Sequence, residues 1–450
     1  MVYYTYNKET VVLDDVAFSS GGEGEIHHVQ TCPSRFNNVC AKIYFKPQRT
    51  ADRAKKIRFM VENPPKNIVT QSIMMAWPLE TLHDNTGQFI GFLMPTAFPK
   101  SNKLVILTTP KLKNSYKDEW YKFDKEYDIK MALVTRLKLI NNIAIPVHLL
   151  HDTHKYILKD FKPDNVLVTP SGKVTIVDMD SIQICEGGNM LFPGTAATEE
   201  YVPPEFYKGV GRDKKPLNES WDSFAVSVVF YKLLFGLNPY VVTPMKETED
   251  SCTIPYCIEN NLFPFGNNAS KILKFPPPHR NFKIIPQPIQ NLFIRSFGDN
   301  PGDRPSAIEW VKTIKQVIEK TGSPTNVPPP KQVEEYTLSV VTTKHGKITL
   351  SKYKARPGDI ITVNNNPEWE YKLEYFSYSS TDGTVYVDKK NTFVMPKSNV
   401  KVNAVFTKKE EATSTESSGG SGTGLVILKI ILWIAAIGIG AARVIYLMSR

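Results

Sequence analysis

The feature that most constrains this chain is a short polar loop between two apolar runs, YILKDFKPDNVLV at residues 156–168. The loop carries an aspartate, a lysine and an asparagine: Asp160, Lys162 and Asn165. A strand-like segment, VTIVDMD, follows and places a second aspartate, Asp178, 18 residues after the first. Lys-Pro-Asp-Asn is also good turn chemistry, so an exposed polar turn is the alternative interpretation. The 18-residue interval from Asp160 to Asp178 suits a loop, a hairpin and a carboxylate at the end of a strand. It therefore favours a functional site over an exposed turn.

These side-chain types indicate phosphoryl transfer. A carboxylate such as Asp160 can orient an attacking hydroxyl and accept its proton, and a cation such as Lys162 can stabilise the transferred phosphate. An amide and a carboxylate together can hold Mg²⁺. Asn165 and Asp178 are therefore the candidate metal ligands.

Two further pieces lie nearer the N-terminus. The glycine-rich turn SSGGEGEIHHV contains Gly21, Gly22 and Gly24, whose backbone N–H groups could approach phosphates closely. A plain hairpin turn is the alternative. Lys42 interrupts the apolar run VCAKIYF shortly afterwards. A lysine in such a run is usually an edge or surface residue.

Together these pieces resemble a protein kinase domain. In that family a strand lysine grips the α- and β-phosphates of ATP and pairs with a glutamate on the next helix. The resemblance assigns these roles to Lys42 and to Glu62, which ends the segment ADRAKKIRFMVE; helix capping is the alternative for Glu62. GFLMPTAF, at 91–98, resembles the hinge strand whose backbone would bind adenine. The implied cofactors are ATP and Mg²⁺, with Mn²⁺ as an alternative metal.

Three motifs depart from the usual wording of the family, and the first is the glycine-rich turn, in which Ser19 replaces the initial glycine. Leu-Lys-Asp at 158–160 replaces His-Arg-Asp, and Asp-Met-Asp at 178–180 replaces Asp-Phe-Gly. We expect Met179 to fill the phenylalanine pocket. Asp180 is expected to restrict the backbone and to add a carboxylate near the metals.

Three later residues distinguish a protein kinase from a small-molecule kinase. In GTAATEEYVPPEF, Glu205 resembles the glutamate that ends the activation segment. Asp222, in WDSFAVSVVFYKLLFGLNPY, resembles the buried aspartate that binds the catalytic-loop backbone, and Arg304 resembles the ion-pair partner of Glu205. The wording VDMDSIQI, of the form DxDSxQ, together with PPE resembles a bacterial branch of eukaryotic-like Ser/Thr protein kinases.

The resemblance implies a Ser/Thr protein kinase that acts on protein substrates, with Asp160 as the catalytic base. Thr195 or Thr198 could be a phosphorylated switch, with Lys159 as its partner. The alternative is a pseudokinase scaffold that binds nucleotide or partners without transfer. The substrate, the activating signal and the oligomeric state are not given by the sequence.

The resemblance implies an α+β, bilobal kinase-like fold, and changes in composition along the chain predict smaller parts after it. The kinase domain should cover residues 1–320, with an N-lobe of about 1–95 and a C-lobe of about 96–320. The parts predicted to follow are a Pro-rich linker at 321–335, a small all-β module at 336–407, a flexible tether at 408–424 and a single transmembrane helix at 425–448.

The β-module resembles internalin-type bacterial repeats. The Pro-Gly-Asp turn at 357–359 and the run FVMPKSNV at 393–400 carry the resemblance. ATP implies a cytoplasmic kinase, and a single span after both domains puts the module on the same side. We therefore expect the module to have a spacing role or a docking partner in the cytoplasm.

The apolar segment at 425–448 could run about 36 Å as a helix, enough for a bilayer core of about 30 Å. A buried or surface-lying helix is the alternative, but a flexible tether precedes it. The formal net charge of +10 is moderate for 450 residues, so no nucleic-acid partner is expected. We predict a single-pass C-terminal anchor in the inner (cytoplasmic) membrane.

Overall fold

The computed structural model describes residues 1–211, 215–245, 252–321, 335–341, 343–380, 385–388 and 391–409. They fall into two compact units, Met1–Gln332 and Val333–Arg450. Most of the predicted linker, the tether beyond residue 409 and the predicted membrane helix lie outside the described residues.

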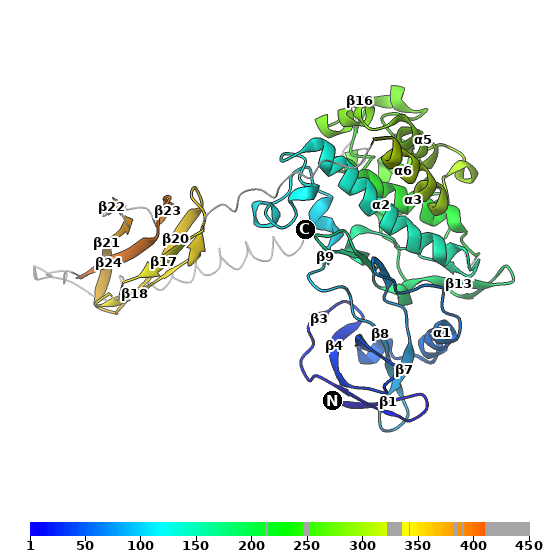
Figure 1. Cartoon of the computed structure of the whole chain (residues 1–450), viewed down its shortest axis with the longest axis horizontal. Coiled ribbons are helices and arrows are strands. Elements are labelled where there is room, and N and C mark those ends of the chain that lie inside the picture. Colours follow the sequence, from blue (N-terminus) through cyan, green and yellow to red (C-terminus); the bar gives the residue numbers. More distant parts are fainter. Residues whose placement is uncertain are drawn as a thin grey trace, which may run out of the picture. The chain divides into compact units, whose positions relative to one another are not determined.

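The first unit begins with an antiparallel sheet in the order β2-β1-β7-β8-β5-β4-β3, which forms the N-lobe (Figure 1). Its strands are β1 (Val2–Thr5), β2 (Thr10–Leu13), β3 (Ser19–Ser20), β4 (Gly24–Thr31), β5 (Val39–Tyr44), β7 (Glu80–His83) and β8 (Phe89–Pro95). Strand β5 lies between β4 and β8, so its polar backbone is paired on both sides. The apolar run around Lys42 is therefore a central strand.

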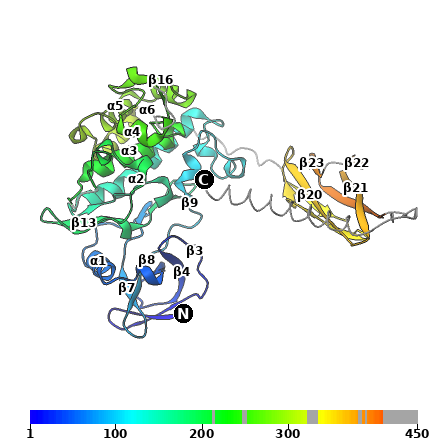
Figure 2. The same cartoon turned by 180° about the vertical axis from the view of Figure 1, so that it is seen from behind.

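One helix, α1 (Ala51–Glu62), packs on β7 and β8 of this sheet (Figure 2). It begins at Thr50, whose hydroxyl accepts a hydrogen bond from Arg53 N. Its buried residues are Lys56, Ile57 and Met60. The buried face of α1, which packs on the sheet, therefore carries a lysine.

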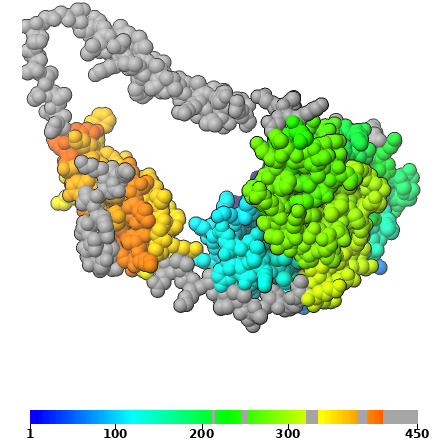
Figure 3. Space-filling model, turned by 90° about the horizontal axis from the view of Figure 1, so that it is seen from above, coloured from blue at the N-terminus to red at the C-terminus, as the bar shows by residue number. Residues whose placement is uncertain are grey.

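The C-lobe is mainly helical, with α2 (Ile129–His151), α3 (Glu219–Phe235), α4 (Ile254–Glu259), α5 (Gln287–Ser296) and α6 (Ala307–Thr321). Asp128 caps α2 by accepting a hydrogen bond from Met131 N, and α2 packs against α3 and α6. Of the helices that the structure describes, α2 alone is long and apolar enough to cross a membrane, and more than half of its most apolar stretch is buried. Seen from above, this lobe hides nearly all of the N-lobe sheet (Figure 3).

Short strands between the lobes carry the polar loop. One sheet has the order β6-β12-β11-β9 and another the order β10-β13-β14. Their bounds are β6 (Ile73–Met75), β9 (Asn102–Lys103), β10 (Tyr156–Ile157), β11 (Val166–Val168), β12 (Val174–Ile176), β13 (Gln183–Glu186) and β14 (Asn189–Phe192). The loop at 158–165 connects β10 to β11, and Asp178 follows β12. This confirms the predicted placement of both aspartates.

Further short elements complete the first unit. A two-stranded ribbon pairs β15 (Thr243–Pro244) with β16 (Ile272–Lys274). The 3-10 turns are η1 (Lys46–Gln48), η2 (Leu104–Leu107), η3 (Asn114–Tyr116), η4 (Tyr121–Phe123), η5 (Pro163–Asn165), η6 (Met179–Ser181), η7 (Glu199–Tyr201), η8 (Pro204–Phe206), η10 (Ala269–Lys271), η11 (Pro277–Ile284) and η12 (Pro301–Asp303).

The second unit is all-β in its described residues, as predicted. Its sheets have the orders β19-β17-β24-β21-β22 and β18-β20-β23. The strands are β17 (Tyr336–Val340), β18 (Gly346–Leu350), β19 (Lys354–Ala355), β20 (Ile360–Pro367), β21 (Tyr371–Ser380), β22 (Val385–Asp388), β23 (Thr392–Val394) and β24 (Val400–Lys408). Alternate residues of β24, from Val400 to Phe406, point into a small apolar core.

Candidate active site

A cleft of about 710 Å³ lies between the two lobes of the first unit. The structure brings almost all of the predicted site residues to this cleft. Those that line it are Gly21, Gly22, Gly24, Lys42, Asp160, Lys162, Asn165 and Asp178. Glu62 is the exception, because it lines a separate cavity of about 400 Å³ over α1.

The glycine turn joins β3 to β4 and closes on itself, with Gly21 N donating to Gly24 O at 2.9 Å. A Cβ on Gly24 would lie 2.3 Å from Ile43 O, so the close approach of β5 requires glycine there. A Cβ on Gly22 would meet nothing within 4 Å. Gly24 therefore serves the fold, whereas Gly22 leaves the backbone of the turn open to a ligand.

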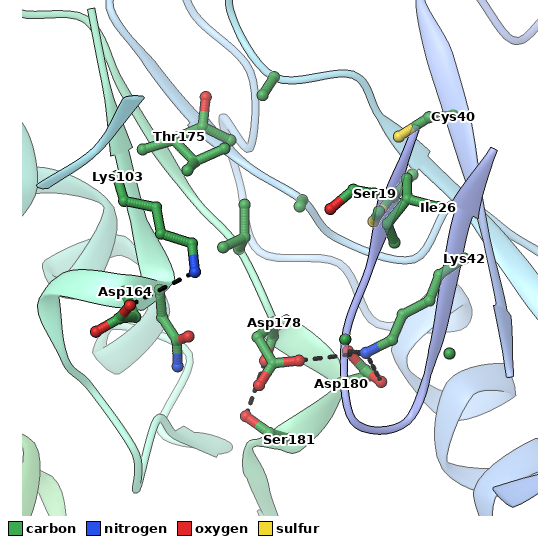
Figure 4. A pocket seen from close by; sticks show the side chains of 18 of the residues that line it. Ser19, Ile26, Cys40, Lys42, Lys103, Asp164, Thr175, Asp178, Asp180 and Ser181 are labelled. Atoms are coloured by element: carbon green, nitrogen blue, oxygen red, sulfur yellow. Dashed lines mark hydrogen bonds and ion pairs between the residues drawn. The ribbon is translucent and has the colours of Figure 1, made fainter. Parts of the chain in front are cut away.

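Lys42 reaches from β5 to two carboxylates, as Figure 4 shows. Its Nζ donates to Asp180 Oδ1 and Oδ2 at 2.8 and 2.7 Å and to Asp178 Oδ1 at 3.2 Å. Burial opposes the charged ammonium, but Asp180 and Asp178 outweigh it and raise the pKa of Lys42. Tyr44 OH also donates to Asp180 Oδ2, at 2.5 Å. Burial opposes the charge of Asp180 as well, but Lys42 and Tyr44 outweigh it and lower the pKa of Asp180.

The prediction that Glu62 pairs with Lys42 is not what the structure shows. Glu62 is exposed and accepts a hydrogen bond from Arg58 Nε at 2.7 Å, one helical turn away. It lies two residues beyond the buried Met60, and hence about 200° around the helix from it. Instead, Lys42 binds Asp180 through both carboxylate oxygens in a buried ion pair and contacts Asp178 at 3.2 Å.

The catalytic loop holds a hydroxyl between its carboxylate and its lysine. Thr198 Oγ1 donates to Asp160 Oδ1 at 2.6 Å and accepts from Lys162 Nζ at 2.9 Å. Lys162 Nζ also donates to Asp160 Oδ2 at 2.6 Å. A hydroxyl in this position contacts both of the groups that a phosphoryl acceptor would need.

Asn165 and Asp178 face the cleft from neighbouring turns. Asn165 Nδ2 donates to Asp160 O at 3.0 Å, which fixes the amide group. Burial and the nearby Asp180 raise the pKa of Asp178. Among the described residues, no group of three or more His, Cys, Asp or Glu could hold a metal by itself. An amide and a carboxylate facing a cleft suit Mg²⁺, which takes few protein ligands and completes its shell with phosphate and water oxygens.

Residues of α3 hold the catalytic loop at 158–165 in place. Asp222 accepts hydrogen bonds from Leu158 N at 2.7 Å and Lys159 N at 2.9 Å, as predicted. His151 Nε2 lies 2.9 Å from the same carboxylate, and Trp221 Nε1 donates to Lys159 O at 3.0 Å. Lys159 has a positive φ of 63°, which L side chains rarely adopt. These hydrogen bonds maintain the uncommon backbone.

The end of the activation segment is tied to the C-lobe as predicted. Arg304 donates to Glu205 Oε1 and Oε2 at 2.6 and 2.8 Å, and the Arg304 side chain is almost fully buried. Nearer the cleft, Lys159 Nζ donates to Gly194 O at 2.9 Å. Thr195 is exposed, whereas Thr198 is bound by the catalytic loop. Phosphorylation of either threonine stays a prediction.

The end of β8 and the residues after it line the cleft from Met94 to Phe98, where the hinge was predicted. Met179 is buried, as expected for a side chain that fills an apolar pocket. The sequence analysis did not single out Tyr44, which donates to Asp180, or Lys56, which is buried on α1. The signal for Lys56 was a lysine, rather than a glutamate, near the apolar residues in the middle of α1.

Comparisons with known proteins agree with this geometry. A protein kinase domain model matches residues 82–314, more than half of the 450-residue chain, and a divergent InlB B-repeat domain model matches residues 336–410. Protein kinase YegI of Escherichia coli K12 is 25% identical over 306 residues, covering 65% of this chain and 43% of that protein. The chain therefore spans less than half the length of this relative.

Serine/threonine-protein kinase MRCK alpha of Homo sapiens is 26% identical over 107 residues, covering 24% of this chain and 6% of that protein. Serine/threonine-protein kinase Genghis Khan of Drosophila melanogaster is 26% identical over 110 residues, or 24% of this chain and 7% of that protein. Catalytic loop, cleft and family model agree: the chain belongs to the protein kinase domain family.

Proposed function

We propose that this chain is a Ser/Thr protein kinase that transfers the γ-phosphate of ATP to protein hydroxyls, with Asp160 as the catalytic base. The observation that carries the proposal is the Thr198 hydroxyl, which donates to Asp160 and accepts from Lys162. An aliphatic hydroxyl therefore fits between these two groups. The serine/threonine kinases among the relatives give further support.

Each residue has a chemical task in this proposal. Asp160 orients the acceptor hydroxyl and takes its proton, and Lys162 donates to the phosphoryl group as negative charge develops on it. Lys42 binds the phosphates of the nucleotide, and Gly22 lets the backbone of the glycine turn approach them. Asn165 and Asp178 would hold Mg²⁺, which when bound neutralises charge on the transferring phosphoryl group.

Incubation of the full-length chain with radiolabelled ATP and Mg²⁺ tests the proposal. Asp160→Asn should lower the rate of phosphoryl transfer to a protein acceptor by about 1000-fold, because a positioned base contributes roughly 10²–10⁴-fold to the rate. Nucleotide binding should be retained. Asp152→Asn, at an exposed position just after α2, is the matched control. Label on serine or threonine supports the proposal. Binding of nucleotide without any transfer, with Mg²⁺ or Mn²⁺, would favour the pseudokinase scaffold.

We propose further that residues 425–448 anchor the chain in the inner membrane, with both domains in the cytoplasm. Trp369, in the β-module, is 90% exposed, so a cysteine placed there should be accessible. In a Cys252→Ser background, Trp369→Cys should react with a membrane-impermeant maleimide only after cells are lysed. Labelling in intact cells would contradict this topology.

A further inference from the structure

The inner face of α1 carries a buried cation without a hydrogen-bond partner. Lys56 is only 5% exposed, and its Nζ has no hydrogen-bond partner among the described residues. Burial lowers the pKa of Lys56 to about 8, and Asp180 is the main group that opposes this lowering. Burying an ammonium group without a hydrogen-bond partner costs folding free energy. The buried position of Lys56 therefore calls for an explanation.

Lys42 has no free donor in this structure. An ammonium has three N–H donors, and Lys42 Nζ contacts three carboxylate oxygens, two of Asp180 and one of Asp178. To donate to a nucleotide phosphate, Lys42 must release at least one of these oxygens. Release from Asp178 alone frees one donor, and a second contact to the phosphates requires an oxygen of Asp180.

A released oxygen of Asp180 needs a new partner because the carboxylate is buried. Tyr44 OH already donates to it and is a single donor. Arg53 is committed to Glu23, to which it donates twice, at 3.0 and 2.8 Å. Lys56 is the remaining cation that interacts electrostatically with Asp180 in the described part of the chain.

We propose that Lys56 is a positioning residue that takes over Asp180 when Lys42 turns to the phosphates of the nucleotide. Lys56 then compensates the buried carboxylate, and Lys42 binds phosphate without leaving a charge unpaired. The cation on α1 thus replaces the carboxylate that a kinase normally carries on this helix, and Asp180 supplies the carboxylate instead. This inference rests on the proposed function, because it assumes that nucleotide binds at Lys42.

The affinity of the full-length chain for a fluorescent ADP analogue, with Mg²⁺ and with EDTA, tests the inference. Lys56→Met should weaken binding by about tenfold, equivalent to about 1.4 kcal/mol, in both conditions. The melting temperature without nucleotide should not fall, since the substitution removes an unpaired buried charge. Lys55→Met, at the exposed neighbouring position on α1, is the matched control and should bind as the wild type does.

A second variant separates positioning from a purely structural role. In an Asp180→Asn background, Lys56→Met should cause no further loss of affinity, because its partner is already gone. An equal loss in both backgrounds, or a lower melting temperature with unchanged affinity, would overturn the inference. Wild-type affinity in Lys56→Met would overturn it and leave the proposed function standing. A wild-type chain that binds no nucleotide would overturn both.

Discussion

Each lobe holds a charged side chain at the cleft, and the two lobes do so through different kinds of interaction. On the C-lobe side, Asp160 sits on a loop that Asp222 holds through backbone N–H groups. On the N-lobe side, Lys42 is held by a buried carboxylate, Asp180, from a segment more than a hundred residues away in sequence. Both supports come from segments distant in sequence, but the first is a set of hydrogen bonds to backbone N–H groups and the second is a buried ion pair. The effect of a substitution in the buried Lys42–Asp180 ion pair should therefore depend more on which partner is removed and on what replaces it.

The largest expected effect on stability lies on the C-lobe side. Glu205→Gln leaves the buried Arg304 without its charged partner, and such a change costs about 3–5 kcal/mol. Glu309→Gln removes a similar carboxylate from the exposed pair with Arg295, where the cost should be below about 1 kcal/mol. Urea unfolding of both variants measures the difference. Equal losses would show that burial does not govern these pairs.

Acid should destabilise the C-lobe, because this lobe contains a buried histidine that is neutral in the folded chain. Tyr231 OH and the carbonyl of Val241 lie 2.6 and 3.0 Å from the two ring nitrogens of His279. Burial lowers the pKa of His279 from 6.5 to about 4. The unfolded chain therefore binds a proton first, and stability should fall as the pH drops from about 6.5 to about 4, by about 3 kcal/mol.

The control for this prediction is His279→Gln, which cannot take up the proton. Urea unfolding at pH 7 and at pH 4.5 should show a smaller acid-induced loss in the variant than in the wild type. The same loss in both proteins would mean that other groups dominate the acid response of the C-lobe.

The glycine turn offers a smaller test on the N-lobe side. Gly24→Ala would place a methyl group 2.3 Å from Ile43 O, and overpacking of this kind costs about 2 kcal/mol. Gly22→Ala meets no neighbour within 4 Å and should change the free energy of unfolding by less than about 0.5 kcal/mol. Thermal unfolding of the two variants distinguishes the glycine that the fold needs from the one that is open to a ligand. The reverse order of effects would contradict this division.

What the sequence could predict follows the same division between the two sides. Asp160, Asn165 and Asp178 lie within one loop and hairpin, so short-range patterns place them correctly. The partner of Lys42 depends on which face of α1 is buried and on how the turn after β12 packs against β5. Neither can be predicted from a short stretch of sequence. The structure shows that the buried face of α1 carries Lys56, Ile57 and Met60. This face is defined only when the helix packs on the sheet. The prediction that Glu62 pairs with Lys42 was therefore wrong, although Glu62 is the one glutamate in the segment 51–62.

The most direct test of the account compares two carboxylates as partners of Lys42. Steady-state kcat/KM for ATP should fall by at least about 100-fold in Asp180→Asn, because the buried carboxylate that positions Lys42, and that Lys56 compensates once Lys42 binds phosphate, is lost. Glu62→Gln should stay within about twofold of the wild type, since the partner of Glu62 among the described residues is Arg58, on the surface of α1. Loss of kcat/KM in Glu62→Gln with activity retained in Asp180→Asn would contradict the account and restore the helix glutamate as the anchor.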